Sequence, residues 1–174
     1  SRRLTPRQLA PRSRTLLNSR FPGGQDMEFL PIFLDVRDKP CLVVGGGEIA
    51  TRKIANLRRA GAAIRVVSPH LAEPLRSQAE KNQFVHVART FEEEDLEGMH
   101  LVVAATDERA VNRQVAALAR DRRIPVNVVD QPQDCSFIMP SVIDRSPVVI
   151  AVSTGTASPV LARLLRTRLE SLIP

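Results

Sequence analysis

Three consecutive glycines, Gly45, Gly46 and Gly47, stand between a short apolar run at residues 41–44 and a segment with helical spacing. The apolar run predicts a buried strand, and the apolar spacing that follows predicts an amphipathic helix. In the pattern G-x-G-x-x-A, Gly45 can take the positive φ of a sharp turn, Gly47 leaves the backbone open to a pyrophosphate, and Ala50 lets helix and strand pack closely. The free N–H groups of the new helix would face the phosphates. This stretch predicts a dinucleotide site; the alternative is a turn with a purely structural purpose.

Other polar groups also follow predicted strands. Thr106 and Asp107 come after the apolar run at 100–105, and Asp130 comes after the run at 124–129. Ligands of open α/β sheets bind at the carboxyl ends of the strands, so we expect these groups to lie near the glycine turn. Another predicted strand ends in Ser-Pro-His at 68–70, where an acid commonly binds the ribose 2′-hydroxyl. Because no acid is present, this position leaves NAD and NADP both open.

The residues alone leave two roles open for Asp130. As a turn residue it would cap its own backbone. As a carboxylate at the mouth of a cleft it could accept protons as a general base. Asn127, on the same predicted strand, is interpreted as a structural polar residue.

A loop of small polar residues at 153–156 precedes Ser158 and Pro159, a pair typical of a helix start. Its hydroxyl and N–H groups beside a helix N-terminus suit a carboxylate or a phosphate, and the alternative is a plain helix entry. Arg145, Arg163 and Arg166 either are solvated or collect the acidic groups of a substrate.

The histidines and cysteines do not predict a metal site. His70, His86 and His100 lie in three separate predicted elements without ligand spacing. Cys41 and Cys135 form no metal or redox motif, which favours two reduced thiols in a cytoplasmic protein.

Strands and helices alternate along most of the chain, which predicts a doubly wound α/β fold with a parallel sheet. The 43% of hydrophobic residues are enough for a substantial core. The alternation stops after Asp130, because residues 131–147 contain three prolines and few helix signals. The last third then predicts an appended element that could pair two chains or close a cleft. We expect strands at 41–44, 64–68, 84–87, 100–105, 124–129 and 148–152, and helices after Gly47, at 71–81, at 91–96, after an N-cap at Asp107 and from Ser158.

The net charge of +6 is concentrated in the first 26 residues. They hold six of the 25 basic and one of the 19 acidic residues, a net of +5, and the remaining 19 basic and 18 acidic residues leave +1. We interpret residues 1–26 as a disordered basic tail, favouring vector or upstream sequence before a start at Met27 over a transit peptide or a nucleic-acid arm. The chain has no Trp or Tyr for base stacking and no apolar run of about 18 residues, so we expect neither nucleic-acid nor membrane partners.

Several runs of the sequence carry a resemblance to a known family. They are Leu-Pro-Ile-Phe at 30–33, Val-Gly-Gly-Gly-Glu-Ile-Ala at 44–50 with Arg-Lys at 52–53, Ala-Ala-Thr-Asp at 104–107, Asn-Val-Val-Asp at 127–130, the more specific block at 136–147, and Ser-Pro-Val-Leu-Ala-Arg at 158–163. With these runs in order from Met27 to Pro174, the chain resembles the precorrin-2 dehydrogenase and sirohydrochlorin ferrochelatase family. It is most similar to the N-terminal half of the fused siroheme synthase.

The resemblance implies two activities in siroheme biosynthesis. The first is NAD-dependent oxidation of precorrin-2 to sirohydrochlorin, and the second is insertion of ferrous iron, a substrate, to give siroheme. It also implies a homodimer with a Rossmann NAD-binding domain at 27–130, a dimerisation region at 131–157 and a small C-terminal helical element at 158–174. The fused enzyme continues into an S-adenosylmethionine-dependent methyltransferase domain, so this chain is either a fragment or a stand-alone version.

The resemblance also assigns roles to individual residues. Asp130 falls on the family's key aspartate, proposed as the general base of both steps. Thr154 stands where the fused enzyme has a serine known for phosphorylation. Two other classes stay open: a Rossmann oxidoreductase with a different small substrate, and a non-enzymatic NAD-sensing module. Cofactor contacts are expected at Gly45, Gly46, Gly47, Glu48, Ile49, Pro69, His70, Thr106 and Asp107, and tetrapyrrole contacts at Asn127, Ser136, Arg145, Ser153, Thr154, Gly155 and Arg163.

Overall fold

The computed structural model describes residues 28–155 and 157–173, so the basic tail predicted at 1–26 lies outside the described residues. The chain divides after Leu30, and the unit that begins at Pro31 contains all the helices and strands of the described residues.

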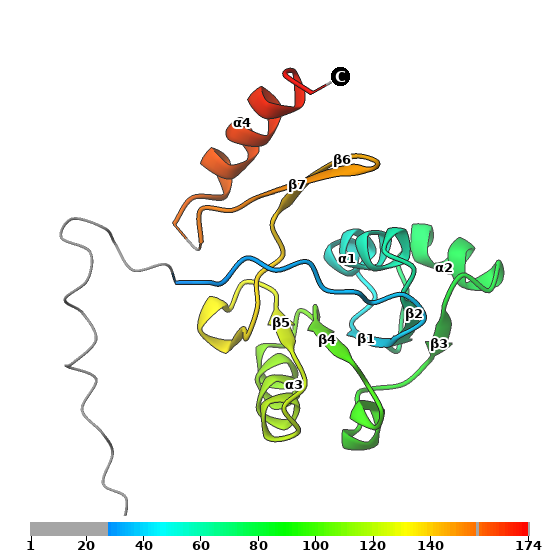
Figure 1. The fold of residues 1–174 in the computed structure, drawn as a ribbon. Helices are drawn as coiled ribbons and strands as arrows, with labels where there is room; N and C mark the ends of the chain where they lie inside the picture. Colours follow the sequence, from blue (N-terminus) through cyan, green and yellow to red (C-terminus); the bar gives the residue numbers. More distant parts are fainter. Residues whose placement is uncertain (1–27, 156, 174) are drawn as a thin grey trace, which may run out of the picture. The chain divides into compact units, whose positions relative to one another are not determined.

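A five-stranded parallel sheet with the order β3-β2-β1-β4-β5 forms the centre of this unit (Figure 1). Residues 41–44 of β1 are buried, as expected for a parallel strand covered on both faces. Val44 pairs with Val67 on one side and with Ala104 on the other, so these strands end at one edge. The strand order reverses between β1 and β4, which is where open α/β sheets bind ligands. The strands are β1 (Pro40–Val44), β2 (Ala63–Val67), β3 (Val85–Val87), β4 (Leu101–Ala104) and β5 (Val126–Val128).

Helices cover both faces of the sheet, which confirms the predicted doubly wound α/β fold. α1 (Glu48–Arg59) and α2 (Glu73–Glu80) pack on one face, and α3 (Arg109–Asp121) packs on the other together with the 3-10 turn η1 (Glu93–Leu96) (Figure 1). Each helix turns one apolar stripe toward the strands. The inward side chains are Ala50, Ile54 and Leu57 of α1 and Val115, Ala116 and Ala119 of α3.

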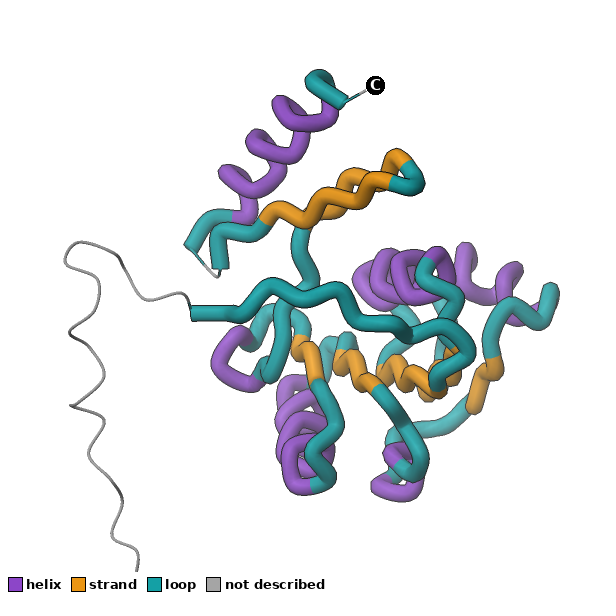
Figure 2. The backbone as a smooth tube through the Cα atoms, viewed as in Figure 1, coloured by secondary structure: helices purple, strands orange, loops and turns teal. Residues whose placement is uncertain are grey.

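A separate antiparallel hairpin follows the 3-10 turn η2 (Pro132–Asp134). It consists of β6 (Ser141–Arg145) and β7 (Val148–Val152), and α4 (Pro159–Glu170) packs against it, with Ile143 and Ala162 buried between them (Figure 2). The sequence did not predict β6, because the prolines around it favoured a loop. Pro140 and Pro147 flank this strand and do not interrupt its ladder, so the strand forms.

The predicted N-cap at Asp107 is wrong. Helix α3 begins at Arg109 with Glu108 as its N-cap residue, and no side chain caps it. The side chain of Asn112, inside the helix, holds the residue before Asp107: it accepts hydrogen bonds from the N–H and the hydroxyl of Thr106 and donates one to the carbonyl oxygen of Thr106. Among the described residues, no helix combines the length and the apolar character that crossing a bilayer requires.

Candidate dinucleotide and substrate site

The glycine turn has the geometry that the sequence predicted. Gly45 has a φ of +119°, which only glycine adopts readily. A Cβ at Gly45 would come within 2.6 Å of the carbonyl carbon of Ala105, and a Cβ at Gly46 would come within 2.8 Å of the Oγ atom of Ser68. A Cβ at Gly47 would meet no atom within 4 Å. Gly45 and Gly46 therefore serve packing, whereas Gly47 borders open space where a pyrophosphate could approach the backbone.

The N-terminus of α1 is free to bind an anion. Gly47 is its N-cap residue and no side chain caps the helix, so the first N–H groups have no side-chain acceptor. Glu48 is exposed and Ile49 is half-buried at this end. Because free N–H groups and the positive end of the helix dipole favour phosphates, these residues fit the pyrophosphate of a dinucleotide.

The segment after β2 lies against the glycine turn. The Oγ atom of Ser68 donates a hydrogen bond to the carbonyl oxygen of His70 at 2.7 Å, and the N–H of Ala72 donates one to Gly46 at 2.7 Å. These bonds leave Pro69 and His70 exposed beside the turn. The structure thus brings these two predicted cofactor residues to the glycine turn.

Thr106 and Asp107 follow β4 at the same edge. The N atom of Thr106 lies 3.0 Å from the Cβ position of Gly45, so Thr106 borders the turn directly. Its polar groups are occupied by Asn112, as described above, while Asp107 is exposed. Of these two predicted cofactor residues, Asp107 has the more accessible side chain.

Asp130 stands exposed at the carboxyl end of β5, with a φ of +57°. This left-handed conformation is uncommon outside glycine, although Asp and Asn tolerate it, and residues that hold it cluster at functional sites. The neighbouring Gln131 is buried, and its Oε1 atom has no hydrogen-bond partner among the described residues. An exposed carboxylate beside a buried unpaired amide oxygen suits a ligand-binding position.

Two other predicted substrate residues, Asn127 and Ser136, form side-chain hydrogen bonds with other parts of the chain. The Nδ2 atom of the buried Asn127 donates to the carbonyl oxygen of Phe137 at 3.0 Å, and its Oδ1 atom accepts from the Nζ atom of Lys53 at 3.1 Å. The Oγ atom of Ser136 accepts from the N–H of Val126 at 2.7 Å. These contacts agree with the structural role that the residues suggested for Asn127, and substrate contact by either side chain stays a prediction.

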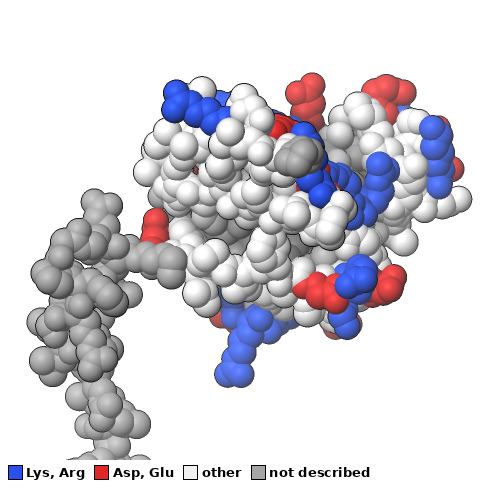
Figure 3. Space-filling view, turned by 45° about the horizontal axis from the view of Figure 1, so that its top comes forward, with Lys and Arg blue, Asp and Glu red and all other residues white. Residues whose placement is uncertain are grey.

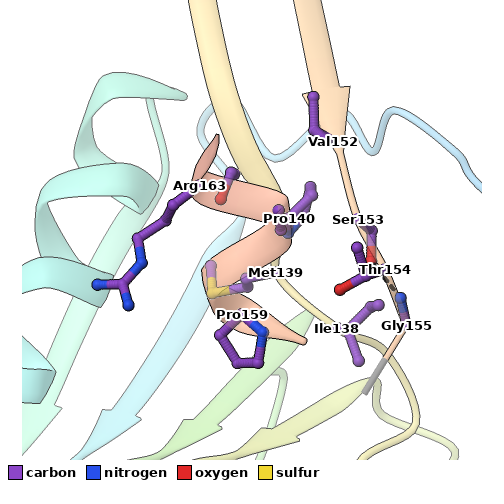
Figure 4. Close-up of a pocket in the computed structure, with 11 residues that line it drawn as sticks. Ile138, Met139, Pro140, Val152, Ser153, Thr154, Gly155, Pro159 and Arg163 are labelled. Carbon is purple, nitrogen blue, oxygen red and sulfur yellow. Dashed lines mark hydrogen bonds between the residues drawn. The ribbon is translucent and has the colours of Figure 1, made fainter. Parts of the chain in front are cut away.

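A cavity of about 350 Å³ lies between the hairpin and the start of α4 (Figure 4). Its lining includes Ser153, Thr154, Gly155 and Arg163, so the structure brings four predicted substrate residues together. The hydroxyl of Thr154 donates to the carbonyl oxygen of Ser158 at 2.8 Å, which fixes the loop at the helix start. The remaining lining residues are Ile138, Met139, Pro140, Ser141, Val152, Pro159 and Ala162.

Arg145 does not line this cavity. Its guanidinium pairs with Glu170 at 3.4 Å, and Arg166 pairs with the same carboxylate at 3.1 Å. The pair of Arg145 connects the hairpin to α4, the pair of Arg166 lies within α4, and the Nε atom of Arg166 also donates to the carbonyl oxygen of Val142 in the hairpin. Substrate binding by Arg145 stays a prediction.

Lys53 is not among the predicted site residues. Lys53 follows Ala50 by three residues and precedes Leu57 by four, which places it beside the inward stripe of α1. This spacing is the feature of the sequence that indicates a partly buried lysine. Burial lowers the pKa of the Lys53 ammonium, and attraction to Cys135 and Asp130 opposes that change.

The cysteines and the surface charges point to no further chemistry. Burial raises the pKa of the Cys41 thiol to about 11, so it is a structural side chain. The described residues include no group of three or more His, Cys, Asp or Glu that could hold a metal ion. On the face in Figure 3, acidic and basic side chains of the described residues form small separate groups around uncharged surface.

Comparisons with known proteins agree with this geometry. Residues 32–141 match a family described as "Putative NAD(P)-binding". Siroheme synthases of Methylobacillus flagellatus and Nitrosospira multiformis are each 56% identical to the chain, over 85% of its length and 32% of theirs. The chain therefore spans about a third of the length of these relatives. A solved structure described as SirC, precorrin-2 dehydrogenase, has a TM-score of 0.72 and 32% identity, over 84% of this chain and 72% of the other.

Proposed function

Because the chain belongs to the family described as putative NAD(P)-binding and is similar to a solved precorrin-2 dehydrogenase, we propose that it oxidises precorrin-2 to sirohydrochlorin with NAD and then inserts ferrous iron to give siroheme. The observation that carries this proposal is the position of Asp130. Its strand β5 lies two strands from β1, whose end carries the glycine turn. Since neighbouring strands are about 4.8 Å apart, a dinucleotide held at the turn can extend toward Asp130.

NAD, when bound, accepts a hydride from the macrocycle. The N–H groups at the start of α1 would hold its pyrophosphate, and Gly47 would let the phosphates approach the backbone. Oxidation of precorrin-2 also releases a proton, and Asp130 would accept it as a general base. The same carboxylate would accept the pyrrole N–H protons that leave when iron enters the ring. One exposed carboxylate could therefore serve both steps.

The remaining parts of the proposal concern substrate and assembly. The cavity at Thr154 and Arg163 would bind the acidic side groups of the tetrapyrrole through hydroxyl and guanidinium groups. The hairpin and α4 expose apolar side chains, which supports a homodimer formed through this region. The two free cysteines are consistent with a cytoplasmic enzyme.

The test is an anaerobic assay of the wild type and of Asp130→Asn with precorrin-2 and NAD. Asparagine tolerates the left-handed backbone of residue 130 and removes the base, so the variant should fold normally. We expect NADH and sirohydrochlorin from the wild type, and a rate about 10²- to 10⁴-fold lower from the variant. Asp121→Asn, at the exposed end of α3, is the control and should keep the wild-type rate. A wild type that binds NAD but leaves precorrin-2 unchanged would refute the proposal.

Addition of ferrous iron to equal amounts of sirohydrochlorin, prepared with the wild type and supplied to both proteins, then tests the second step. The absorbance spectrum should change to that of siroheme in the wild type and stay that of sirohydrochlorin in Asp130→Asn. Equal rates of iron insertion in both proteins would exclude Asp130 from this step and leave its role in oxidation intact.

A further inference from the structure

Lys53 lies where α1 passes the end of the sheet that carries Asp130. It is half-buried, and its Nζ atom donates a hydrogen bond to the Oδ1 atom of Asn127 in the middle of β5. Asn127 is itself buried and held by the carbonyl oxygen of Phe137. The position of the ammonium is therefore fixed by a rigid partner on the sheet.

The partner of Lys53 is neutral. Among the described residues, no carboxylate lies within ion-pair distance of its Nζ atom, so its charge is not neutralised by direct contact. A partly buried cation without a counter-ion is costly, and the lowered pKa of Lys53 reflects this cost. An ammonium also has three N–H donors, and Asn127 accepts only one of them. These features favour an anionic ligand at Lys53.

The direction of the Lys53 side chain indicates whether this anion is a phosphate of the dinucleotide or a group near Asp130. Gly47, where the dinucleotide phosphates would bind, lies six residues earlier, or about 9 Å along the axis of α1. The Lys53 side chain reaches β5, the strand that ends two residues before Asp130, and attraction to Cys135 and Asp130 acts on its ammonium. The anion is therefore expected beside Asp130 and away from the phosphates.

We propose that Lys53 binds a carboxylate side group of the tetrapyrrole and so holds the macrocycle against Asp130. This inference rests on the proposed function, because it requires a polycarboxylate substrate at Asp130. Precorrin-2 and sirohydrochlorin carry eight carboxylates, so one can reach Lys53 while others occupy the cavity at Arg163. Lys53 is thus a substrate-binding residue that sets the position of the ring.

The experiment compares Lys53→Gln, Lys53→Arg and Lys81→Gln with the wild type. Glutamine keeps an N–H donor for Asn127 and removes the charge, whereas arginine keeps the charge. Lys81 is exposed after the end of α2 and serves as the matched control. The measurements are the dissociation constant for sirohydrochlorin by anaerobic spectroscopic titration at several salt concentrations, the dissociation constant for NAD by calorimetry, and the Tm.

We expect Lys53→Gln to weaken sirohydrochlorin binding on the order of 10- to 100-fold and to flatten its salt dependence. Lys53→Arg should stay within a few-fold of the wild type, and NAD binding should not change in any variant. Wild-type sirohydrochlorin affinity in Lys53→Gln would overturn the inference. If Lys53→Gln lost affinity for NAD and kept its affinity for sirohydrochlorin, Lys53 would belong to the phosphate site and the inference would be wrong. It would also be wrong if Lys53→Gln and Lys53→Arg lost sirohydrochlorin affinity equally and both had a lowered Tm, because Lys53 would then have a structural role. Failure of the wild type itself to bind sirohydrochlorin would instead refute the proposed function.

Discussion

The carbonyl oxygen of Gly46 accepts a hydrogen bond from the N–H of Ala72 at 2.7 Å, which fastens the glycine turn to the segment after β2. A Cβ at Gly46 would also collide with the carbonyl oxygen of His70. We therefore expect Gly46→Ala to lower the free energy of unfolding by about 1–3 kcal/mol through overpacking. Thermal unfolding followed by circular dichroism measures this, and an unchanged Tm would contradict the packing role.

Gly47→Ala should affect NAD binding more than stability. Gly47 has a φ of −84°, which alanine adopts without strain, and the added Cβ meets open space. We expect the Tm to fall by only about 2–4 °C, because alanine is a poorer N-cap residue than glycine by roughly 1 kcal/mol and nothing else is strained. The NAD dissociation constant should rise on the order of 10-fold or more, because the Cβ stands where the pyrophosphate approaches.

Calorimetric titration with NAD compares Gly47→Ala with Gly61→Ala. Gly61 follows the end of α1, far from the predicted phosphates, and its φ of +78° makes alanine strained there. This second variant should lose stability and keep its NAD affinity at a temperature where it is folded. Normal NAD binding by Gly47→Ala would show that the open space at Gly47 is not the phosphate site.

Asp95, in the 3-10 turn η1, forms a buried ion pair. Its carboxylate accepts two hydrogen bonds from Arg89, at 2.8 and 2.9 Å, and its side chain is only 4% exposed. Burial works to raise the pKa of Asp95, but the bonds from Arg89 and from the N–H of Glu92 outweigh it and lower the pKa. Since the Arg89 side chain is 38% exposed, we expect Asp95→Asn to cost about 2 kcal/mol, or about 4–8 °C in Tm.

The pH dependence of this difference checks its origin. Because the pKa of Asp95 is lower in the folded chain than its usual value of 3.8, its contribution is fully present above that value and is lost as the pH falls through the folded pKa. The Tm gap between wild type and Asp95→Asn should therefore shrink below about pH 4. Glu73→Gln, which removes the carboxylate of an exposed pair with Arg76, is the control and should change the Tm little at any pH.

The sequence predicts the sheet and the glycine turn because local rules determine both. The apolar runs at 41–44 and 100–105 are long enough to specify buried strands, and only glycine allows the φ of Gly45. The start of α3 could not be placed from the sequence, because its N-cap residue Glu108 makes no side-chain cap hydrogen bond. A helix that starts without a side-chain cap gives no capping signal at its boundary residue.

The candidate site is harder to predict because its parts lie far apart in the sequence. Asp130 and the glycine turn could be placed at one edge, because the ends of parallel strands meet there. The bond between Lys53 and Asn127 joins residues 74 positions apart and depends on how α1 packs on the sheet. Likewise, the pairing of Arg145 with Glu170 depends on the contact of α4 with the hairpin, which no local pattern specifies.

The hairpin and α4 supply the last prediction, which concerns assembly. Val148 is 51% exposed and Leu164 is 58% exposed, and other apolar side chains of both elements are exposed as well. Unpaired apolar surface of this kind favours association, so we expect the wild type to be a dimer and Leu164→Glu to be a folded monomer. Analytical ultracentrifugation measures the mass in solution. Val85→Glu places the same charge at a 62% exposed valine of the outer strand β3 and should leave the dimer intact. A dimeric Leu164→Glu with the wild-type dissociation constant, or a monomeric wild type, would show that this surface does not pair two chains.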